Sequence, residues 1–264
     1  MNSATITSPA NRLVKTLASL QERKHRDALG LVWAEGRRVA DAALRGAWPA
    51  EMLVLATGAT DVDGLAARAA ARGAQVVRVH DDCFARISGV KHAEGIAAVL
   101  RRPGGVPLPG APRRTLVLWQ LQDPGNAGTI VRSAVAFGCR SVVAVGPCVD
   151  LCHPQAVRAT AGALFETVVH TVDEGAALAW LRCHAARAAL LSAEAAVPLP
   201  AMRGGAIDLI VVGNEPRGLP AMLDDTFQHA AIPMAAGVGS LNVTAAAAIA
   251  LYELWGAPSA PSHP

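Results

Sequence analysis

The chain has 264 residues, of which 52% are hydrophobic and 17% charged. This length suits one large domain or two ordinary ones, and so low a share of charge excludes an intrinsically disordered protein. The net charge of +3 is unevenly spread: residues 1–105 contain 15 Lys and Arg against 10 Asp and Glu, and the remainder contains 9 against 11. A basic first part favours a module that binds a polyanion, although a plain solvated surface explains the excess equally well.

No stretch reaches the roughly 18 apolar residues of a membrane span, and residues 1–15 lack the charged start and apolar run of a secretory signal. We therefore expect no membrane segment and a cytoplasmic location. The five cysteines include no CxxC pair, which favours a reducing compartment. The nearest approach to a metal motif is Cys148, Cys152 and His153, which lacks a second ligand pair, so we expect ordinary packing and no metal site.

The first predicted element is a helix with Ser8 as N-cap and Pro9 as first residue, ending near Asp27. Strand-like and helix-like segments then alternate, which predicts a small α/β domain. The strands are expected at 29–34, 51–56, 74–79 and 95–100, and the helices near 36–45, 61–72 and 81–87. Residues 101–114 are rich in Pro and Gly and lack periodicity. We therefore divide the chain into a domain at 1–102, a linker at 103–113 and a second domain at 114–264.

In the second domain, residues 115–122 are almost continuously apolar, which predicts a buried strand. A helix is predicted over 126–137, with Gly138 ending it. Further strands are expected at 141–146, 166–172, 189–194, 208–213 and 229–234, and helices near 154–164, 173–187, 219–226 and 240–255. This alternation predicts a mostly parallel sheet covered on both faces.

Ligands of such folds lie beyond the carboxyl ends of the strands, which directs attention to the loops at 121–138, 211–220 and 232–248. None contains a P-loop, a GxGxxG motif, a GxSxG elbow or an HExxH motif, so we expect neither an ordinary nucleotide site nor a hydrolase. Arg132 is predicted on the inner turn of an apolar helix, where its charge needs an anion. That anion is either a ligand or a structural partner such as Glu215.

Three segments carry a specific resemblance: DPGNAGTIVRSA (123–134), GNEPRGL (213–219) and IPMAAGVGSLNVTAAAA (232–248). In this order they resemble the motifs of the SpoU (TrmH) branch of the SPOUT RNA methyltransferases. Residues 1–105 resemble the small ribosomal-protein-like α/β domain that often precedes this catalytic domain. The resemblance implies a C-terminal parallel-sheet α/β domain with a deep trefoil knot, a homodimer, and methyl transfer from S-adenosylmethionine to a ribose 2′-hydroxyl of rRNA or tRNA.

Carried over by position, the resemblance assigns both cofactor contacts and active-site residues. The cofactor contacts, chiefly through backbone groups, are Gly213, Ile232 and Leu241, and the polar active-site positions are Asn126, Arg132, Glu215, Ser240 and Asn242. The family nominates Arg132 to help the hydroxyl lose its proton, but a guanidinium normally stays protonated. We therefore favour a role in which Arg132 grips the adjacent phosphate and stabilises the developing alkoxide. Asn126 and Ser240 are also candidate helix N-caps, and Trp119 and Gln120 receive no functional role.

Basic residues in and just after the first helix are the candidate RNA contacts. They are Arg12, Lys15, Arg23, Lys24, His25, Arg26, Arg37 and Arg38. Such side chains would position RNA through its phosphates, and the alternative is a solvated helix face. Aromatic residues are only 4%, which favours recognition by shape over base stacking. The predicted target is structured RNA, with 23S rRNA preferred and no DNA; a tRNA target, a base atom as acceptor, or a non-catalytic RNA-binding assembly protein remain the alternatives.

Overall fold

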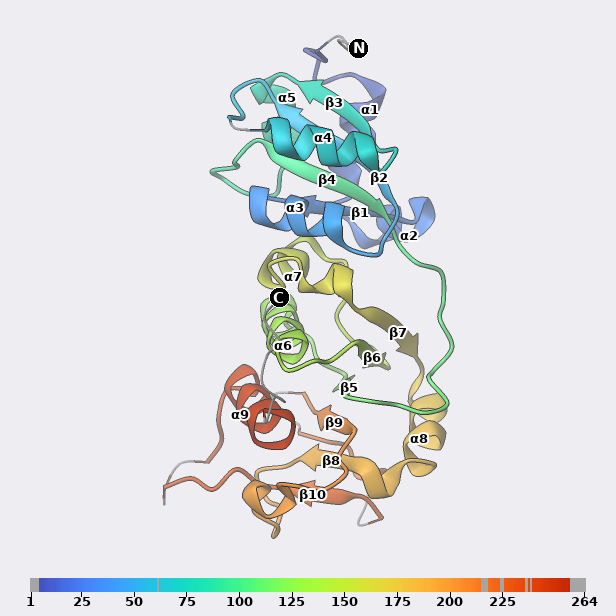
Figure 1. Ribbon diagram of the computed structural model, residues 1–264, viewed down its shortest axis with the longest axis vertical. Coiled ribbons are helices and arrows are strands. Elements are labelled where there is room, and N and C mark those ends of the chain that lie inside the picture. The colour runs from blue at the N-terminus through green and yellow to red at the C-terminus, as the bar shows by residue number, and fades with distance from the viewer. Residues whose placement is uncertain are drawn as a thin grey trace. The chain divides into compact units, whose positions relative to one another are not determined.

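A computed structural model of the chain describes residues 5–60, 62–214, 218–223, 226–235, 237 and 239–256. The chain forms two compact units, Met1–Gly104 with Asp150–Glu166, and Gly105–Val149 with Thr167–Pro264. Within the described residues, the first unit contains a four-stranded sheet and the second a six-stranded sheet (Figure 1). Residues 150–166 therefore pack with the first unit, although the sequence division places them in the second domain.

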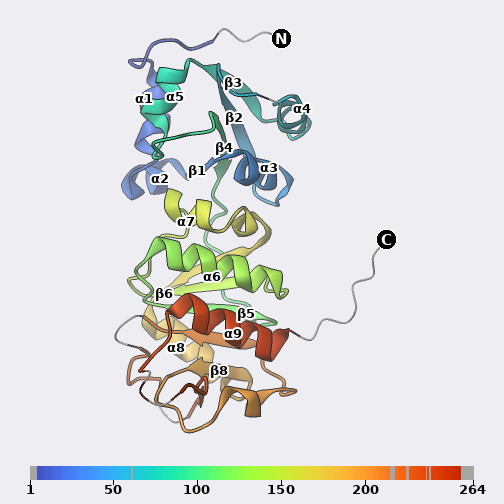
Figure 2. The ribbon, with the colours of Figure 1, turned by 90° about the vertical axis from the view of Figure 1, so that its left-hand side faces the viewer.

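The first unit is a sheet between two layers of helices. The strand order is β1-β4-β2-β3, with β4 antiparallel to both its neighbours and β3 parallel to β2. Helices α1 and α5 cover one face, and α3 and α4 cover the other (Figure 2). The strands are β1 (Leu31–Glu35), β2 (Ala50–Ala56), β3 (Gln75–Val79) and β4 (Ile96–Arg101), and the helices are α1 (Arg12–Ser19), α2 (Arg23–Leu29), α3 (Arg37–Arg45), α4 (Asp63–Ala71), α5 (Asp81–Ile87), α7 (Pro154–Ala159) and the 3-10 helix η1 (Ala163–Glu166). The small α/β fold predicted for residues 1–102 is confirmed.

The single N-terminal helix predicted from Ser8 is wrong, because the structure has two helices, α1 and α2, in its place. The N-cap of α1 is Asn11, whose side-chain oxygen accepts a hydrogen bond from the Leu13 N–H at 2.8 Å. Ser8 instead accepts a hydrogen bond from the Ala10 N–H within the preceding turn. Both residues are good caps, and the chain uses the later one.

Hydrogen bonds from one buried side chain explain why the two helices are separate. The guanidinium of Arg26 donates hydrogen bonds to the carbonyl oxygens of Leu20 and Gln21, both at 2.8 Å. A continuous helix would need those carbonyl oxygens for its own backbone N–H groups. Nothing local in the sequence reveals this competition.

The second unit is a parallel sheet in the order β10-β8-β9-β5-β6-β7. Helices α6 and α9 cover one face and α8 the other (Figures 1 and 2). The strands are β5 (Thr115–Trp119), β6 (Ser141–Val145), β7 (Val168–Val172), β8 (Ala188–Leu191), β9 (Leu209–Val212) and β10 (Gln228–Ala230). The helices are α6 (Pro124–Ala136), α8 (Glu174–Arg182), α9 (Val243–Trp255) and the 3-10 helices η2 (Ala185–Arg187) and η3 (Leu199–Met202). The parallel sheet covered on both faces is confirmed, and Trp119 is a core residue, as expected of a large aromatic side chain at a strand end.

Two of the predicted helices differ in the structure. The helix predicted near 154–164 ends at Ala159, because Ala161 and Gly162 both have positive φ and start a new 3-10 turn. The helix predicted near 219–226 is absent from the described residues 218–223, which form turns and bends. There the Leu223 N–H bonds the carbonyl of Pro220 at 2.9 Å, which closes a turn instead of a helix.

The predicted linker has no helix or strand, but its middle residues are tied to the second unit. The carbonyl oxygen of Val106 lies 3.0 Å from Nδ1 of the buried His170, and the Trp180 indole N–H donates to the carbonyl of Pro109 at 2.8 Å. The side chain of Leu108 packs against the core between them. Residues 106–109 therefore form a strap along β7 and α8 and belong to the second unit.

Candidate active site

The three motif loops follow β5, β9 and β10, so they begin at the carboxyl ends of parallel strands and lie at one edge of the sheet. Strands β5 and β9 are hydrogen-bonded neighbours, and β8 separates β9 from β10. Helices α6 and α9, which follow two of the loops, pack against each other (Figure 2). The fold thus gathers the described parts of three motifs that are far apart in the sequence.

The turn between β5 and α6 gives Asn126 a different place from a helix cap. The N-cap is Asp123, whose side-chain oxygen accepts the Asn126 backbone N–H at 2.6 Å, and Pro124 is the first helical residue. Asn126 lies in the first turn, half-buried, and its side-chain amide makes no hydrogen bond to another described residue. The N-cap interpretation of Asn126 is therefore wrong, and its amide is available to a ligand.

Arg132 lies on α6 with its side chain exposed. The prediction that it points inward is wrong: the buried positions of α6 are Ala127, Gly128, Ile130, Val131 and Ala134. Its guanidinium makes no hydrogen bond or ion pair to the part of the chain that the structure describes. Glu215, its suggested structural partner, lies outside the described residues. Exposure removes the desolvation cost that the sequence suggested and leaves the guanidinium free to meet an external anion.

The loop after β9 is closed tightly around Gly213. The Gly218 N–H bonds the carbonyl of Asn214 at 2.7 Å, and a Cβ at Gly213 would stand 2.5 Å from the Gly218 carbonyl oxygen. Since real Cβ atoms do not approach an oxygen so closely, only glycine fits here. The close approach of Gly218 therefore requires glycine at position 213, and the backbone of Gly213 is not covered by a side chain of its own.

The loop between β10 and α9 contains the remaining predicted residues. Ile232 and Leu241 are half-buried, and their backbone groups make no hydrogen bond to other described residues. Asn242 is the N-cap of α9, accepting the Thr244 N–H at 2.8 Å, so the cap interpretation of Ser240 is wrong. Ser240 is exposed two residues before the helix. The side-chain oxygen of Asn242 thus has a structural task besides its predicted catalytic one.

Sequence reasoning missed a set of side chains that brace the β5–α6 loop. Gln120 has a φ of +52°, rare for a residue other than glycine, and its amide donates to Glu174 Oε1 at 2.7 Å. The Gln122 amide donates to the carbonyl oxygens of Gln120, at 3.0 Å, and of Pro147. The Glu174 side chain comes from α8, 54 residues away, and no local signal marks this pairing.

The candidate RNA contacts separate into exposed and buried residues. Arg12 and Lys15 on α1, and Arg23 and Lys24 on α2, are exposed. The ion pairs of Arg23 with Asp27 and of Lys24 with Glu22 are exposed as well. Arg37 is half-buried at the start of α3 and donates to the carbonyl of Thr60. The four exposed cations stay candidates for phosphate contact.

Arg26 is a correction to the predicted RNA surface. Its side chain is 2% exposed and donates from Nε and Nη2 to Asp150 Oδ2, at 3.1 and 2.8 Å, in addition to its two backbone partners. Protein acceptors take four hydrogen bonds from this guanidinium, and its burial leaves no surface for RNA to contact. Arg26 is therefore a structural residue of the first unit.

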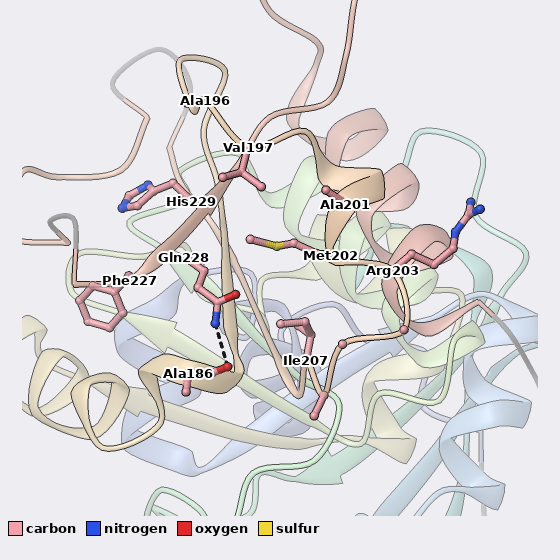
Figure 3. A pocket seen from close by; sticks show the side chains of 13 residues that line it. Ala186, Ala196, Val197, Ala201, Met202, Arg203, Ile207, Phe227, Gln228 and His229 are labelled. Atoms are coloured by element: carbon pink, nitrogen blue, oxygen red, sulfur yellow. Dashed lines mark hydrogen bonds between the residues drawn. The ribbon is translucent and has the colours of Figure 1, made fainter.

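The second unit also contains a pocket of about 700 Å³, lined by residues such as Met202, Ile207 and Phe227 (Figure 3). The Gln228 amide donates to the carbonyl of Ala186 at its floor, at 2.8 Å. None of the predicted site residues lines this pocket.

All five cysteines are free, and burial raises the pKa of Cys152 to about 12, with the Asp150 charge adding to the effect. A thiol held protonated is a poor metal ligand. In the described parts of the chain, no group of three or more His, Cys, Asp or Glu side chains is placed to hold a metal ion. Among the same residues, no helix combines the length and apolar character that crossing a bilayer requires.

Comparison with known proteins gives matches over nearly the whole chain. Residues 113–252 match the model of the SpoU rRNA Methylase family, and residues 11–98 match the MRM3-like substrate binding domain. An uncharacterized tRNA/rRNA methyltransferase of Synechocystis sp. is 32% identical, covering 95% of this chain and 93% of that protein. The 23S rRNA (guanosine(2553)-2′-O)-methyltransferase RlmP of Bacillus subtilis is 25% identical, covering 95% and 99%. A crystal structure of an AdoMet-bound rRNA methyltransferase from Sinorhizobium meliloti is similar with a TM-score of 0.84 and 28% identity, covering 95% and 96%.

Proposed function

Because the chain belongs to the SpoU rRNA methylase family, we propose that it transfers a methyl group from S-adenosylmethionine to a ribose 2′-hydroxyl of rRNA. The observation that carries the proposal is the meeting of the three motif loops at one edge of a parallel sheet. The likeness to the AdoMet-bound rRNA methyltransferase extends over 95% of the chain and supports the same chemistry. Within the proposal, residues 1–102 bind RNA, 103–113 link the domains and 114–264 catalyse the transfer.

The loops fit S-adenosylmethionine through their backbone. Gly213 admits no side chain, and the backbone groups of Ile232 and Leu241 are left without hydrogen-bond partners among the described residues. Such groups can bond the edges of an adenine and the polar end of a methionine without adding charge. When bound, S-adenosylmethionine supplies a methyl group already activated on a sulfonium.

The protein's own task is to orient the ribose and to stabilise its oxygen as it loses a proton. We assign Arg132 to grip the phosphate beside the target ribose and to stabilise the developing alkoxide. Its exposed guanidinium is charged and has no protein partner among the described residues, which suits a phosphate contact better than proton abstraction. The free amide of Asn126, with Ser240, Asn242 and Glu215, completes the proposed polar set.

The test is transfer from labelled S-adenosylmethionine to separate rRNA and tRNA fractions that lack native modifications, followed by nucleoside mass spectrometry. We expect a 2′-O-methylated nucleoside from rRNA, a loss of at least about 100-fold with Arg132→Ala, and a partial loss with Arg132→Lys, because a point charge keeps some phosphate grip without the bidentate geometry. Arg182→Ala, which removes an exposed arginine from α8, is the matched control.

The outcomes separate the alternatives. Product from tRNA alone, or a methylated base, would replace the proposed target. No transfer to either fraction, despite binding of both S-adenosylmethionine and RNA, would favour the non-catalytic RNA-binding protein. Full activity of Arg132→Lys would refute a bidentate phosphate contact.

The proposal includes a homodimer that acts in the cytoplasm. Helix α9 buries Val243, Ala247, Ala250, Leu251 and Trp255, yet Ile249 and Tyr252 remain 41% and 63% exposed. The Tyr252 ring meets that of Phe137 at the end of α6, with centroids 6.1 Å apart. An apolar strip across two packed helices is the kind of surface that a second copy covers.

A further inference from the structure

We propose that Gln120 and Glu174 are positioning residues for methyl transfer: the hydrogen bond between their side chains holds the β5–α6 loop, which leads into the helix that carries Asn126 and Arg132. The inference rests on the proposed function, because it names residues that support that reaction without touching substrate or cofactor. All four residues belong to the second compact unit.

Gln120 has a backbone conformation that favours glycine. It directly follows β5, and its φ of +52° lies in the left-handed region. Its backbone N–H still bonds the carbonyl of Val145 at 3.1 Å, so the pairing of β5 with β6 continues while the chain bends. A glycine would adopt this conformation without strain. A glutamine strains the backbone here, and strained residues of this kind are concentrated at functional sites.

The Gln120 side chain reaches the start of α8. Its amide donates to Glu174 Oε1 at 2.7 Å, and Glu174 is the first residue of that helix, which follows β7. Gly146, directly after β6, lies against both side chains: a Cβ there would stand 3.1 Å from Glu174 Cγ and 3.4 Å from Gln120 Cγ. The hydrogen bond thus links the carboxyl ends of β5 and β7 across that of β6, which lies between them in the sheet.

A second glutamine ties the loop to the same place. The Gln122 amide donates to the carbonyl oxygens of Gln120, at 3.0 Å, and of Pro147. Asp123 follows directly and begins α6 by accepting the Asn126 N–H at 2.6 Å. The conformation of Gln120 therefore constrains where Gln122 and Asp123 lie, and with them the first turn of α6.

Placement of this turn matters for the proposed reaction. The ribose oxygen must lie in line with the methyl group, and small displacements of the groups that orient the reactants can lower a rate by about 100-fold. The proposed contacts to S-adenosylmethionine come from the loops after β9 and β10. A shift of the β5–α6 loop should therefore misplace Asn126 and Arg132 relative to the cofactor without weakening cofactor binding.

Gln120→Gly tests the proposal, because it removes the side chain and relieves the positive φ. We expect kcat for rRNA methylation to fall at least about 10-fold, while the Kd for S-adenosylmethionine and the KM for RNA change less than about 3-fold. The midpoint of urea unfolding should stay close to that of the wild type, since glycine suits this backbone. Glu194→Ala, which removes an exposed carboxylate from the same unit, is the matched control and should leave kcat unchanged.

Glu174 permits a rescue by a conservative variant. Glu174→Ala removes the acceptor and should lower kcat as Gln120→Gly does. Glu174→Gln keeps a side-chain oxygen that can accept the same hydrogen bond, so its kcat should stay within about 3-fold of the wild type. The double variant Gln120→Gly/Glu174→Ala should lose little more than either single variant, because both changes remove one hydrogen bond. Hydrogen exchange of the Asn126 amide should be faster in both single variants, with the amides of β9 unchanged.

Wild-type kcat in Gln120→Gly would overturn the proposal, since the position would then need only a backbone that turns. It is equally overturned if Glu174→Gln loses as much activity as Glu174→Ala, if the two single losses multiply in the double variant, or if activity only follows the folded fraction. Failure of the proposed function is distinct from these results, because the wild-type protein would then methylate neither RNA fraction.

Discussion

The packing of residues 150–166 in the first unit depends on two glycines, which permits a prediction of stability. A Cβ at Gly162 would overlap the Cβ of Ala42 on α3, and Gly162 also has a φ of +98°. At Gly46 a Cβ would stand 2.7 Å from both the Cβ and the carbonyl oxygen of Phe165, without a positive φ. Gly73 has a φ of +71° with no atom within 4 Å of the added Cβ. The three sites therefore separate backbone strain from steric overlap within one unit.

We expect Gly162→Ala to be the most destabilising change. A positive φ costs about 1–2 kcal/mol for a residue with a Cβ and overpacking costs about 1–3 kcal/mol, against about 0.4–1 kcal/mol gained from a stiffer unfolded chain. The free energy of unfolding should fall by about 2–4 kcal/mol for Gly162→Ala, about 1–2 kcal/mol for Gly46→Ala, and at most about 1 kcal/mol for Gly73→Ala.

Urea unfolding followed by tryptophan fluorescence measures these differences, with Trp48 as a direct reporter because its ring packs edge-on against Phe165 at 5.4 Å. A loss for Gly162→Ala within about 0.5 kcal/mol of that for Gly73→Ala would refute the reasoning, since the overlap with α3 would then cost nothing.

Three further outcomes follow from single side chains. The pKa of His153 is lowered, chiefly by burial and then by the Arg26 charge. As the pH drops below about 6.5 the unfolded chain therefore binds this proton before the folded chain does, and the free energy of unfolding should fall. His153→Asn keeps a cap acceptor for α7 and should reduce this pH dependence in urea titrations between about pH 7 and 5, whereas an unchanged dependence would contradict the assignment. The buried Cys152 thiol, with its pKa raised to about 12, should resist iodoacetamide at pH 8, while the exposed Cys183 should react. Peptide mass spectrometry of the treated folded protein measures both, and alkylated Cys152 would count against its burial. Tyr252→Arg should convert the proposed dimer to monomer in analytical ultracentrifugation, whereas an equal dimer fraction would place the interface elsewhere.

Sequence patterns predicted the elements whose signal is local. The strands of both sheets are short apolar runs between turn residues, and α6 ends where Gly138 takes a φ of +84°. The order of the three motifs, together with the rule that ligands lie at the carboxyl ends of parallel strands, also predicts at which edge of the sheet the site lies. The trefoil knot implied by the resemblance stays a prediction.

What the sequence did not predict depends on partners far along the chain. The break between α1 and α2 follows from the Arg26 guanidinium, whose carboxylate partner is 124 residues away. From the sequence, Arg26 looks like one more surface cation of a basic helix, whereas the pairing with Asp150 holds its side chain in the interior. Likewise, the positive φ of Gln120 is accompanied by a hydrogen bond to Glu174 that no spacing rule could supply.

The caps of α6 and α9 show that two of the motifs contain residues with a structural task beside the residues proposed for chemistry. DPGN offers two good cap residues, and the chain uses Asp123 for the backbone, which leaves the Asn126 amide unengaged among the described residues. GSLN also offers two, and there the cap is Asn242, which leaves Ser240 exposed. In both loops the residue that caps the helix N-terminus need not be the one that contacts the ligand. Motif positions of this kind therefore include residues that cap a helix, such as Asp123 and Asn242, and residues that do not, such as Asn126 and Ser240, and only the structure tells which is which.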